Sequence, residues 1–341
     1  MTILIGLLII AVGSFGQSSS YVPINRIKDW SWECFWLVQG IFAWLVFPYL
    51  GALLAVPEGG SLFGIIGSAG GSVVLKTIGF GILWGIGGLT FGLSMRYLGV
   101  ALGQSLALGT CSAFGTLIPP LLPQLFPAAE KMTTILIIGV SIAIAGIAVI
   151  GYAGALKSQN MSEEEKKKAV KDFALKKGLL IALLAGVMSA CFALGLEAGK
   201  PLAVSGGNPL FETLPATLLV TIGGFITNAA YCLFQNIRNG SGKDYFSVPG
   251  ATLLNNLLFC VLAGGLWYSQ FFGLGMGKSY FSDSPVILAF SWSILMSLNV
   301  IFSNVWGIIL KEWKGVSLQT IIVLSAGICL LIFSLLFPNL F

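Results

Sequence analysis

The chain has 341 residues, of which 56% are hydrophobic and 9% charged, with a formal net charge of +5. Its mean hydropathy is +0.93. A soluble domain carries about 25% charged residues, so this composition excludes an ordinary soluble fold and predicts an integral membrane protein. The length is enough for about ten spans of roughly 20 residues each. We expect the lipid bilayer as a partner and no nucleic acid.

Residue types that support catalysis or tight metal binding are scarce. The chain has no His, which excludes His-based metal sites and triads. Its six Cys all lie in apolar stretches without a C-x-x-C motif, so we interpret them as small core residues. No nucleophile–base pair is apparent. We therefore expect no enzyme activity, no metal and no cofactor.

Apolar runs bounded by charges, Pro or Gly predict an all-α protein with ten transmembrane helices. The first run precedes any cation, since the first is Arg26, and is interpreted as a span rather than a cleaved signal peptide. The predicted spans are 3–22, 32–56, 73–95, 98–122, 133–154, 177–199, 213–236, 250–274, 286–310 and 317–338.

The distribution of cations predicts the orientation of these spans. Most of the 18 Lys and Arg residues fall in the loops after spans 1, 3, 5, 7 and 9, and the positive-inside rule assigns those loops to the cytoplasm. Both termini are then expected outside. The most charged loop, 157–177, contains a capping box from Ser162 to Glu165 and is predicted to be a cytoplasmic linker with a short helix.

An internal similarity suggests that the two halves are copies of one unit. LWGIGGLTFGLSMRYLGV (83–100) and LWYSQFFGLGMGKSYFSD (266–283) share Leu, Trp, Gly and Tyr at one offset. The segments 6–14 and 178–189 are also alike, and Glu33 and Glu212 both lie near the start of the second span of their half. Because each half has five spans, the copies are predicted to be inverted, as 1–156 and 178–341, around a central site.

Ionisable groups within spans are costly and are functional candidates by default. The candidates for proton coupling are Glu33, Glu197 and Asp283. Glu33 is flanked by Trp30, Trp32 and Trp36, which alternatively form an interfacial belt. Glu197 alternatively neutralises Lys200, three residues later on one helix face. The candidate charge partners or gating residues are Arg96, Lys200 and Lys278.

Amides, hydroxyls and aromatic rings within spans favour a small neutral ligand of the sugar type. Each residue alternatively makes an interhelical hydrogen bond or packs against lipid. Trp84 and Trp267, related by the repeat, are predicted to meet. The candidate substrate-binding residues are Gln17, Ser18, Trp84, Gln104, Asn255, Asn256, Trp267, Tyr268, Gln270, Trp292 and Asn299.

Several short segments in order along the chain resemble a known family. They are KDWSWE…W (28–36), GLSMRYLG (92–99), LKKGL (175–179), AGKP (198–201), WYSQFF (267–272) and LKEW (310–313). Together they resemble the bacterial L-rhamnose–proton symporter family of the drug/metabolite transporter superfamily.

The resemblance implies ten helices in two inverted five-helix repeats, uptake of L-rhamnose or a related 6-deoxy sugar, proton coupling by alternating access, and location in the bacterial inner membrane. A monomer would suffice. The family's enteric members have a His after span 8, where this chain has Lys278 and GMGKSYF. The proton carrier is therefore expected to differ. An exporter or exchanger of metabolites such as amino acids is the alternative, and a non-transport membrane protein is a more distant one.

Overall fold

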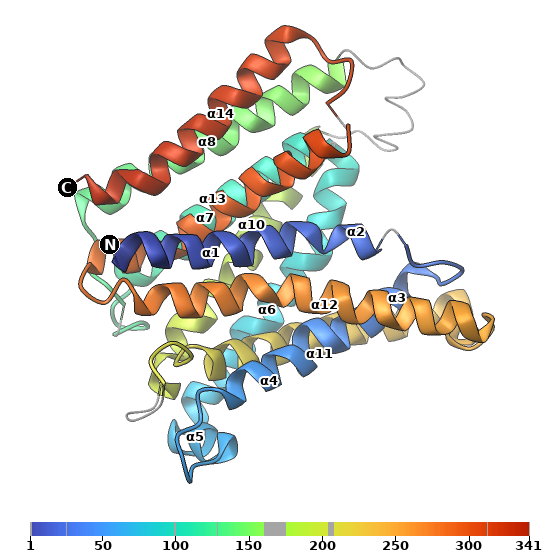
Figure 1. Cartoon of the computed structure of the whole chain (residues 1–341), viewed down its shortest axis with the longest axis horizontal. Helices are drawn as coiled ribbons and strands as arrows, with labels where there is room; N and C mark the ends of the chain where they lie inside the picture. The colour runs from blue at the N-terminus through green and yellow to red at the C-terminus, as the bar shows by residue number, and fades with distance from the viewer. Residues whose placement is uncertain are drawn as a thin grey trace. The chain divides into compact units, whose positions relative to one another are not determined.

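A computed structural model describes residues 2–24, 26–98, 100–127, 129–159, 175–203, 208–311 and 313–340 of the chain. The regular structure in these ranges is entirely helical (Figure 1). Nine helices in them are long and apolar enough to cross a membrane. The remaining predicted span, 98–122, corresponds to α7, whose apolar part Ser105–Leu121 is shorter. The chain thus has the architecture of a multi-pass membrane protein.

The helices follow the predicted spans to within a few residues. The long helices other than that of the second span are α1 (Thr2–Ser19), α6 (Gly71–Leu98), α7 (Val100–Leu121), α8 (Thr134–Gln159), α10 (Leu175–Ala198), α11 (Leu214–Asn239), α12 (Gly250–Ser279), α13 (Pro285–Ile309) and α14 (Leu318–Leu336). Short helices are α2 (Tyr21–Ile24), α5 (Leu62–Ser68), η2 (Lys200–Leu202), η3 (Ser241–Tyr245) and η4 (Phe337–Asn339). Most of the linker predicted at 157–177 lies outside the described residues.

The second span is interrupted by a wider turn. It consists of α3 (Trp32–Ile41), the π-helical segment η1 (Phe42–Val46) and α4 (Phe47–Leu53). Pro48 has no N–H to donate to the carbonyl four residues earlier, and the Phe47 N–H bonds to the carbonyl of Phe42, five residues earlier. A π-helical turn of this kind often marks a functional site.

The chain divides into two compact units, each drawn from both halves of the sequence. Unit 1 comprises Met1–Gly85 and Ala198–Tyr280, and unit 2 comprises Ile86–Glu197 and Phe281–Phe341. Each unit therefore has its own packing, which is described separately below.

In unit 1, α1 lies antiparallel along α12 (Figure 1). A Cβ added at Gly273 would lie 2.9 Å from the carbonyl oxygen of Ile9, and one added at Gly277 would lie 2.8 Å from that of Gly6. These glycines therefore let the two backbones approach closely, as small residues do between helices in lipid. The hydroxyl of Ser269 donates a hydrogen bond of 2.9 Å to the carbonyl of Gly13 across the same interface.

Also in unit 1, α11 packs against α3 and α4. Gly223 of α11 meets the backbone of α6, because an added Cβ would lie 2.7 Å from the amide nitrogen of Ile82. The side chain of Thr227 donates a 3.0 Å hydrogen bond to the carbonyl of Ile82. These contacts hold α3, α6, α11 and α12 together, and these four helices carry the candidate site.

In unit 2, α8 pairs antiparallel with α14 (Figure 1), and α7 packs against α8 and α13. A Cβ at Gly146 would lie 2.8 Å from a methyl carbon of Leu331, and one at Gly327 would lie 2.6 Å from Ile150. Ser112 and Ser293 share a buried hydrogen bond of 2.9 Å between α7 and α13. Unit 2 is thus held by small-residue contacts and an internal polar bond.

Candidate tryptophan and carboxylate site

A row of aromatic side chains follows one face of the second span. Trp32, Trp36 and Trp44 occur at multiples of four residues, which places them on one helical stripe. The rings of Trp32 and Trp36 stack with centroids 5.3 Å apart, and the ring of Trp44 meets that of Trp36 edge-on at 5.7 Å. Gly40 occupies the remaining position of the stripe, between Trp36 and Trp44. A Cβ there would lie 2.6 Å from the Trp44 ring, so the glycine leaves room for that indole.

Trp44 connects this row to the two tryptophans predicted to meet. Its ring centroid lies 6.1 Å from that of Trp84 on α6 and 6.0 Å from that of Trp267 on α12. Trp84 and Trp267 are 5.7 Å apart with their planes inclined by 34°, so the predicted contact between them is confirmed. Trp44 was not among the predicted site residues, although its place one turn after Gly40 on the stripe of Trp36 was readable in the sequence.

Trp36 is fixed to α11 by a hydrogen bond. Its indole N–H donates a 3.1 Å hydrogen bond to Oδ1 of Asn228 on α11. The amide nitrogen of Asn228 in turn donates to the carbonyl of Gly224 at 2.9 Å. The ring of Trp84 also packs directly over Gly224. Because every polar atom in this chain of contacts is used, we assign Trp36 a structural role.

Other buried polar atoms in unit 1 have no such partner. Within the described part of the chain, Gln39 Oε1, Trp44 Nε1 and the Tyr268 hydroxyl make no hydrogen bond. Their side chains are 2%, 4% and 5% exposed. A buried polar atom without a partner costs about 1–3 kcal/mol, and native structures contain few of them. Gln39, like Trp44, was missed by the sequence analysis.

Glu33 lies in the first turn of α3 and is 5% exposed. Among the described residues it is the one buried carboxylate. Its Oε1 accepts a 3.0 Å hydrogen bond from the side-chain amide of Asn239 and a second bond from the hydroxyl of Ser241. Both donors are neutral and lie at the end of α11 or just beyond it. The charge of Glu33 is therefore stabilised by hydrogen bonds rather than by a neighbouring cation.

The hydroxyl of Ser241 has two acceptors and a single proton. Besides Glu33, it lies 3.0 Å from Oδ1 of Asn236, and the amide nitrogen of Asn236 donates to the Tyr245 hydroxyl at 2.8 Å. Burial raises the pKa of Tyr245 to about 12, so this phenol stays neutral at physiological pH. Ser241 can donate to only one acceptor at a time, which makes the network sensitive to the protonation of Glu33.

The remaining predicted carboxylates lie in different surroundings. Asp283 is exposed in the turn between α12 and α13, where the Ser282 hydroxyl donates to it at 3.4 Å. Glu197 is half-buried near the end of α10. The expectation that Glu197 and Lys200 share one helix face is wrong, because α10 ends at Ala198 and Lys200 begins η2.

The predicted polar residues of unit 1 differ in burial and in their hydrogen-bond partners. The side chain of Asn256 is buried and is committed to the loop before α3, since it accepts from the Lys28 N–H at 3.1 Å and donates to the Lys28 carbonyl at 2.8 Å. The amide of buried Gln270 donates to the Trp267 carbonyl at 3.2 Å. Asn255 is exposed on α12.

Gln17 and Ser18 lie in the last turns of α1, where the Ser18 hydroxyl donates to Gln17 Oε1 at 3.3 Å. Lys278 is half-buried in the last turn of α12. Arg96 and Gln104 belong to α6 and α7, but their side chains lie outside the described part of the structure.

Two predicted substrate residues belong to unit 2. Trp292 is 6% exposed, its ring stacks on Phe192 with centroids 5.9 Å apart, and its N–H donates to the carbonyl of Cys111 at 3.3 Å. Asn299, also on α13, is 8% exposed. The indole N–H of Trp292 therefore has its hydrogen-bond partner within unit 2, whereas Trp44, Trp84 and Trp267 belong to unit 1.

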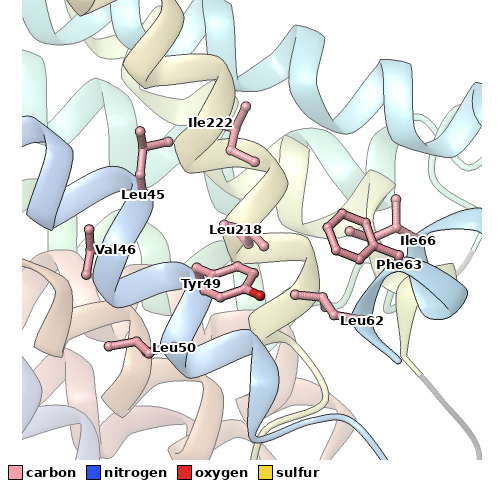
Figure 2. Close-up of a pocket in the computed structure, with 9 residues that line it drawn as sticks. All are labelled: Leu45, Val46, Tyr49, Leu50, Leu62, Phe63, Ile66, Leu218 and Ile222. Atoms are coloured by element: carbon pink, nitrogen blue, oxygen red, sulfur yellow. The ribbon is translucent and has the colours of Figure 1, made fainter. Parts of the chain in front are cut away.

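A separate groove in unit 1, with a volume of about 390 Å³, lies between α4, α5 and α11 (Figure 2). Its lining is formed by Leu45, Val46, Tyr49, Leu50, Leu62, Phe63, Ile66, Leu218 and Ile222, and the exposed lining surface is entirely apolar. A sugar bound there would lose its hydrogen bonds to water without replacement. The groove therefore does not suit a polar ligand.

The described residues contain no cluster of His, Cys, Asp and Glu that would hold a metal ion. What unit 1 offers instead is a group of flat aromatic faces with unpartnered hydrogen-bonding atoms, and a buried carboxylate, Glu33, about three turns before Trp44 on the second span. Aromatic faces pack against the apolar C–H faces of sugars, while amide and indole groups bind hydroxyls. The arrangement suits a neutral polar ligand coupled to a titrating group.

Comparisons with known proteins agree with this chemistry. Residues 1–338 match the family model described as L-rhamnose-proton symport protein (RhaT). An L-rhamnose-proton symporter of Yersinia pestis (strain Pestoides F) is 34% identical over 341 residues, covering 97% of this chain and 95% of the relative. L-rhamnose-proton symporters of Yersinia pseudotuberculosis, from serotype O:1b (strain IP 31758) and serotype O:3 (strain YPIII), are similar to the same extent.

Proposed function

The chain belongs to the L-rhamnose–proton symporter family, and we propose that it takes up L-rhamnose together with a proton across the bacterial inner membrane. The structural observation behind the proposal is that Glu33 lies on the same span as Trp44, which contacts Trp84 and Trp267 within unit 1. A neutral sugar needs aromatic faces and hydrogen bonds, and coupling needs a buried group that gains and loses a proton.

Glu33 is the proton carrier in this proposal. When Glu33 is ionised, the single proton of Ser241 points to the carboxylate. When Glu33 takes up a proton, its own O–H donates to Ser241, and Ser241 turns its proton to Asn236. Protonation thus reverses the direction of the hydrogen bond between Glu33 and Ser241, while the Asn239 amide continues to donate to Glu33.

The sugar is proposed to contact the group of Trp44, Trp84 and Trp267. Glu33 precedes Trp44 by eleven residues, or about 16 Å at 1.5 Å per residue. The π-helical segment Phe42–Val46, which contains Trp44, is a natural point for the span to change its geometry. Reorganisation of hydrogen bonds at Glu33 would therefore be transmitted along the same span to the sugar.

We propose ten spans in two inverted repeats, 1–156 and 178–341, joined by the segment 157–177, with both termini outside. Within the units, several helix pairs join a span to its predicted counterpart: α3 and α4 with α11, α7 with α13, and α8 with α14. The contact of α1 with α12 has its counterpart in that of α10 with α6, where a Cβ at Gly87 would lie 2.6 Å from the Ser189 nitrogen. This pattern supports the repeat, and alternating access follows from it.

The test is Glu33→Gln in vesicles with an imposed inward proton gradient. The amide keeps an oxygen acceptor for Asn239 and Ser241, so we expect the fold to survive. Accumulation of L-rhamnose should fall to the level of passive equilibration, at least tenfold below wild type, while exchange of labelled for unlabelled sugar continues. The matched control is Glu212→Gln, the predicted counterpart, which is exposed.

Wild-type accumulation by the Glu33→Gln variant would remove Glu33 from the mechanism. Failure of the wild-type protein to move L-rhamnose under any gradient would overturn the proposed function itself.

A further inference from the structure

Gln39 and Trp44 stand out because each is deeply buried with an unused hydrogen-bonding atom. Their side chains are 2% and 4% exposed, and within the described residues Gln39 Oε1 and Trp44 Nε1 have no partner. One atom is an acceptor and the other a donor. A folded protein rarely leaves such atoms unpaired unless another molecule completes the bonds.

The two residues belong to neighbouring parts of the same span. Gln39 lies in the last turn of α3, and Trp44 lies in η1, five residues later. Gly40, the neighbour of Gln39, has no side chain, and the Trp44 ring occupies the space that a side chain would need. Cζ3 of that ring lies 2.6 Å from the position of a Cβ added at Gly40. That carbon is on the edge of the indole opposite Nε1, so the N–H points away from the backbone of Gly40.

The backbone of Gln39 also packs on α12. A Cβ at Gly264 would lie 3.3 Å from the Gln39 carbonyl oxygen and 2.9 Å from the nitrogen of Ala43. Trp267, three residues later on α12, contacts the Trp44 ring. The backbone at Gln39 and the ring of Trp44 therefore both pack against the part of α12 that carries Trp267, one of the aromatic faces on which a sugar ring would stack.

We propose that Gln39 and Trp44 are specificity-determining residues that bind hydroxyl groups of the transported sugar. The Trp44 N–H donates to one sugar oxygen, and Gln39 Oε1 accepts from one hydroxyl. A hydroxyl is both donor and acceptor, so a polyhydroxylated neutral ring satisfies both atoms, whereas an apolar or acceptor-only ligand does not. This inference rests on the proposed function and adds to it Gln39 and the hydrogen bond of the Trp44 N–H.

The test is calorimetric titration of the purified full chain with L-rhamnose and with its 2-, 3- and 4-deoxy derivatives. The variant Trp44→Phe removes the N–H, and Gln39→Met removes the acceptor at similar length. Each should weaken L-rhamnose binding about threefold to tenfold, the range of one neutral hydrogen bond. In wild type, the deoxy sugar lacking the partner hydroxyl should bind weaker by a similar factor. In Trp44→Phe or Gln39→Met, the penalty for the matching deoxy sugar should disappear.

Trp36→Phe is the matched control, since it makes the same substitution on the same stripe but removes a bond to Asn228. It should lower the Tm and leave the Kd within about twofold. If Trp44→Phe and Gln39→Met both keep wild-type affinity, or if every deoxy penalty persists in them, the assignment is wrong while the proposed function stands. If wild type binds L-rhamnose neither in the calorimeter nor in vesicles, the proposed function fails and this inference with it.

Discussion

Trp44 of unit 1 and Trp292 of unit 2 are alike in type and burial, with 4% and 6% of their surfaces exposed. Each also lies against a glycine that leaves room for its ring, Gly40 for Trp44 and Gly115 for Trp292. Their hydrogen bonds differ. The Trp292 N–H donates to a carbonyl of α7, whereas the Trp44 N–H has no acceptor in the described part of the chain.

The aromatic rings around Trp44 and Trp292 also differ in number and orientation. Trp292 lies nearly parallel to one ring, that of Phe192, with 15° between the planes. Trp44 meets the rings of Trp36, Trp84 and Trp267 edge-on, at 70°, 90° and 84°. Burial alone therefore does not distinguish the two tryptophans. Their indole N–H groups do, because that of Trp292 is paired and that of Trp44 has no partner among the described residues.

The largest expected effect comes from pushing each ring out of place. In Gly40→Ala the new methyl group collides with the Trp44 ring, and we expect L-rhamnose affinity to fall at least tenfold. In Gly115→Ala it collides with Nε1 of Trp292, and we expect a loss of about 1–3 kcal/mol of stability with unchanged affinity. Thermal unfolding and calorimetry of both variants measure the contrast. Equal losses of affinity in the two would contradict the separate roles.

A smaller effect is expected for Trp292→Phe. It removes the bond to the Cys111 carbonyl and part of the stack on Phe192, so stability should fall by about 1–2 kcal/mol. The Kd for L-rhamnose should not change. Trp313→Phe is the control, because that half-buried ring contacts only the Lys157 ammonium in a cation–π pair at 4.9 Å among its described interactions. Weakened sugar binding in Trp292→Phe would show that Trp292 contributes to sugar binding and is not purely structural.

The smallest effect is expected for Tyr268→Phe. The hydroxyl of Tyr268 is buried against Gly51 without a partner, so its removal should raise stability by up to about 1 kcal/mol. Because Gly51 lies seven residues beyond Trp44, L-rhamnose affinity should fall by less than about threefold. Tyr49→Phe, on an exposed ring, should change neither. A clear loss of stability in Tyr268→Phe would mean that the hydroxyl is paired in solution.

The sequence was sufficient to predict where most helices lie. Apolar runs in a membrane protein leave the backbone no alternative to helix, and α8, α11 and α14 begin within a residue of the predicted spans. The contact of Trp84 with Trp267 was also predicted, from the internal sequence similarity, and is present in the structure. The π-helical segment at Phe42–Val46 was not predicted, since hydrophobic periodicity is weak in a stretch that is apolar all round.

The candidate site was only partly predictable for a related reason. Glu33 was identifiable because a charge within a span is costly, but its partners Asn239 and Ser241 are about 200 residues away and carry no local pattern. Gln39 and Trp44 look like many polar and aromatic residues of a span. Only the finding that their polar atoms lack partners distinguishes them from Asn256 or Trp292, whose bonds are made within the chain.

The π-helical turn gives the second span two registers. An α-helix turns about 100° per residue, so one additional residue in a turn rotates everything after it relative to everything before it. Leu45, Val46, Tyr49 and Leu50 lie within or after this turn and line the apolar groove (Figure 2). Trp36 and Trp44 instead contact α11, α6 and α12 of unit 1. Loss of a single codon within Phe42–Val46 would restore one continuous register and rotate the groove residues by about 100° relative to the tryptophans before them, so a one-residue deletion in this segment should disturb both surfaces.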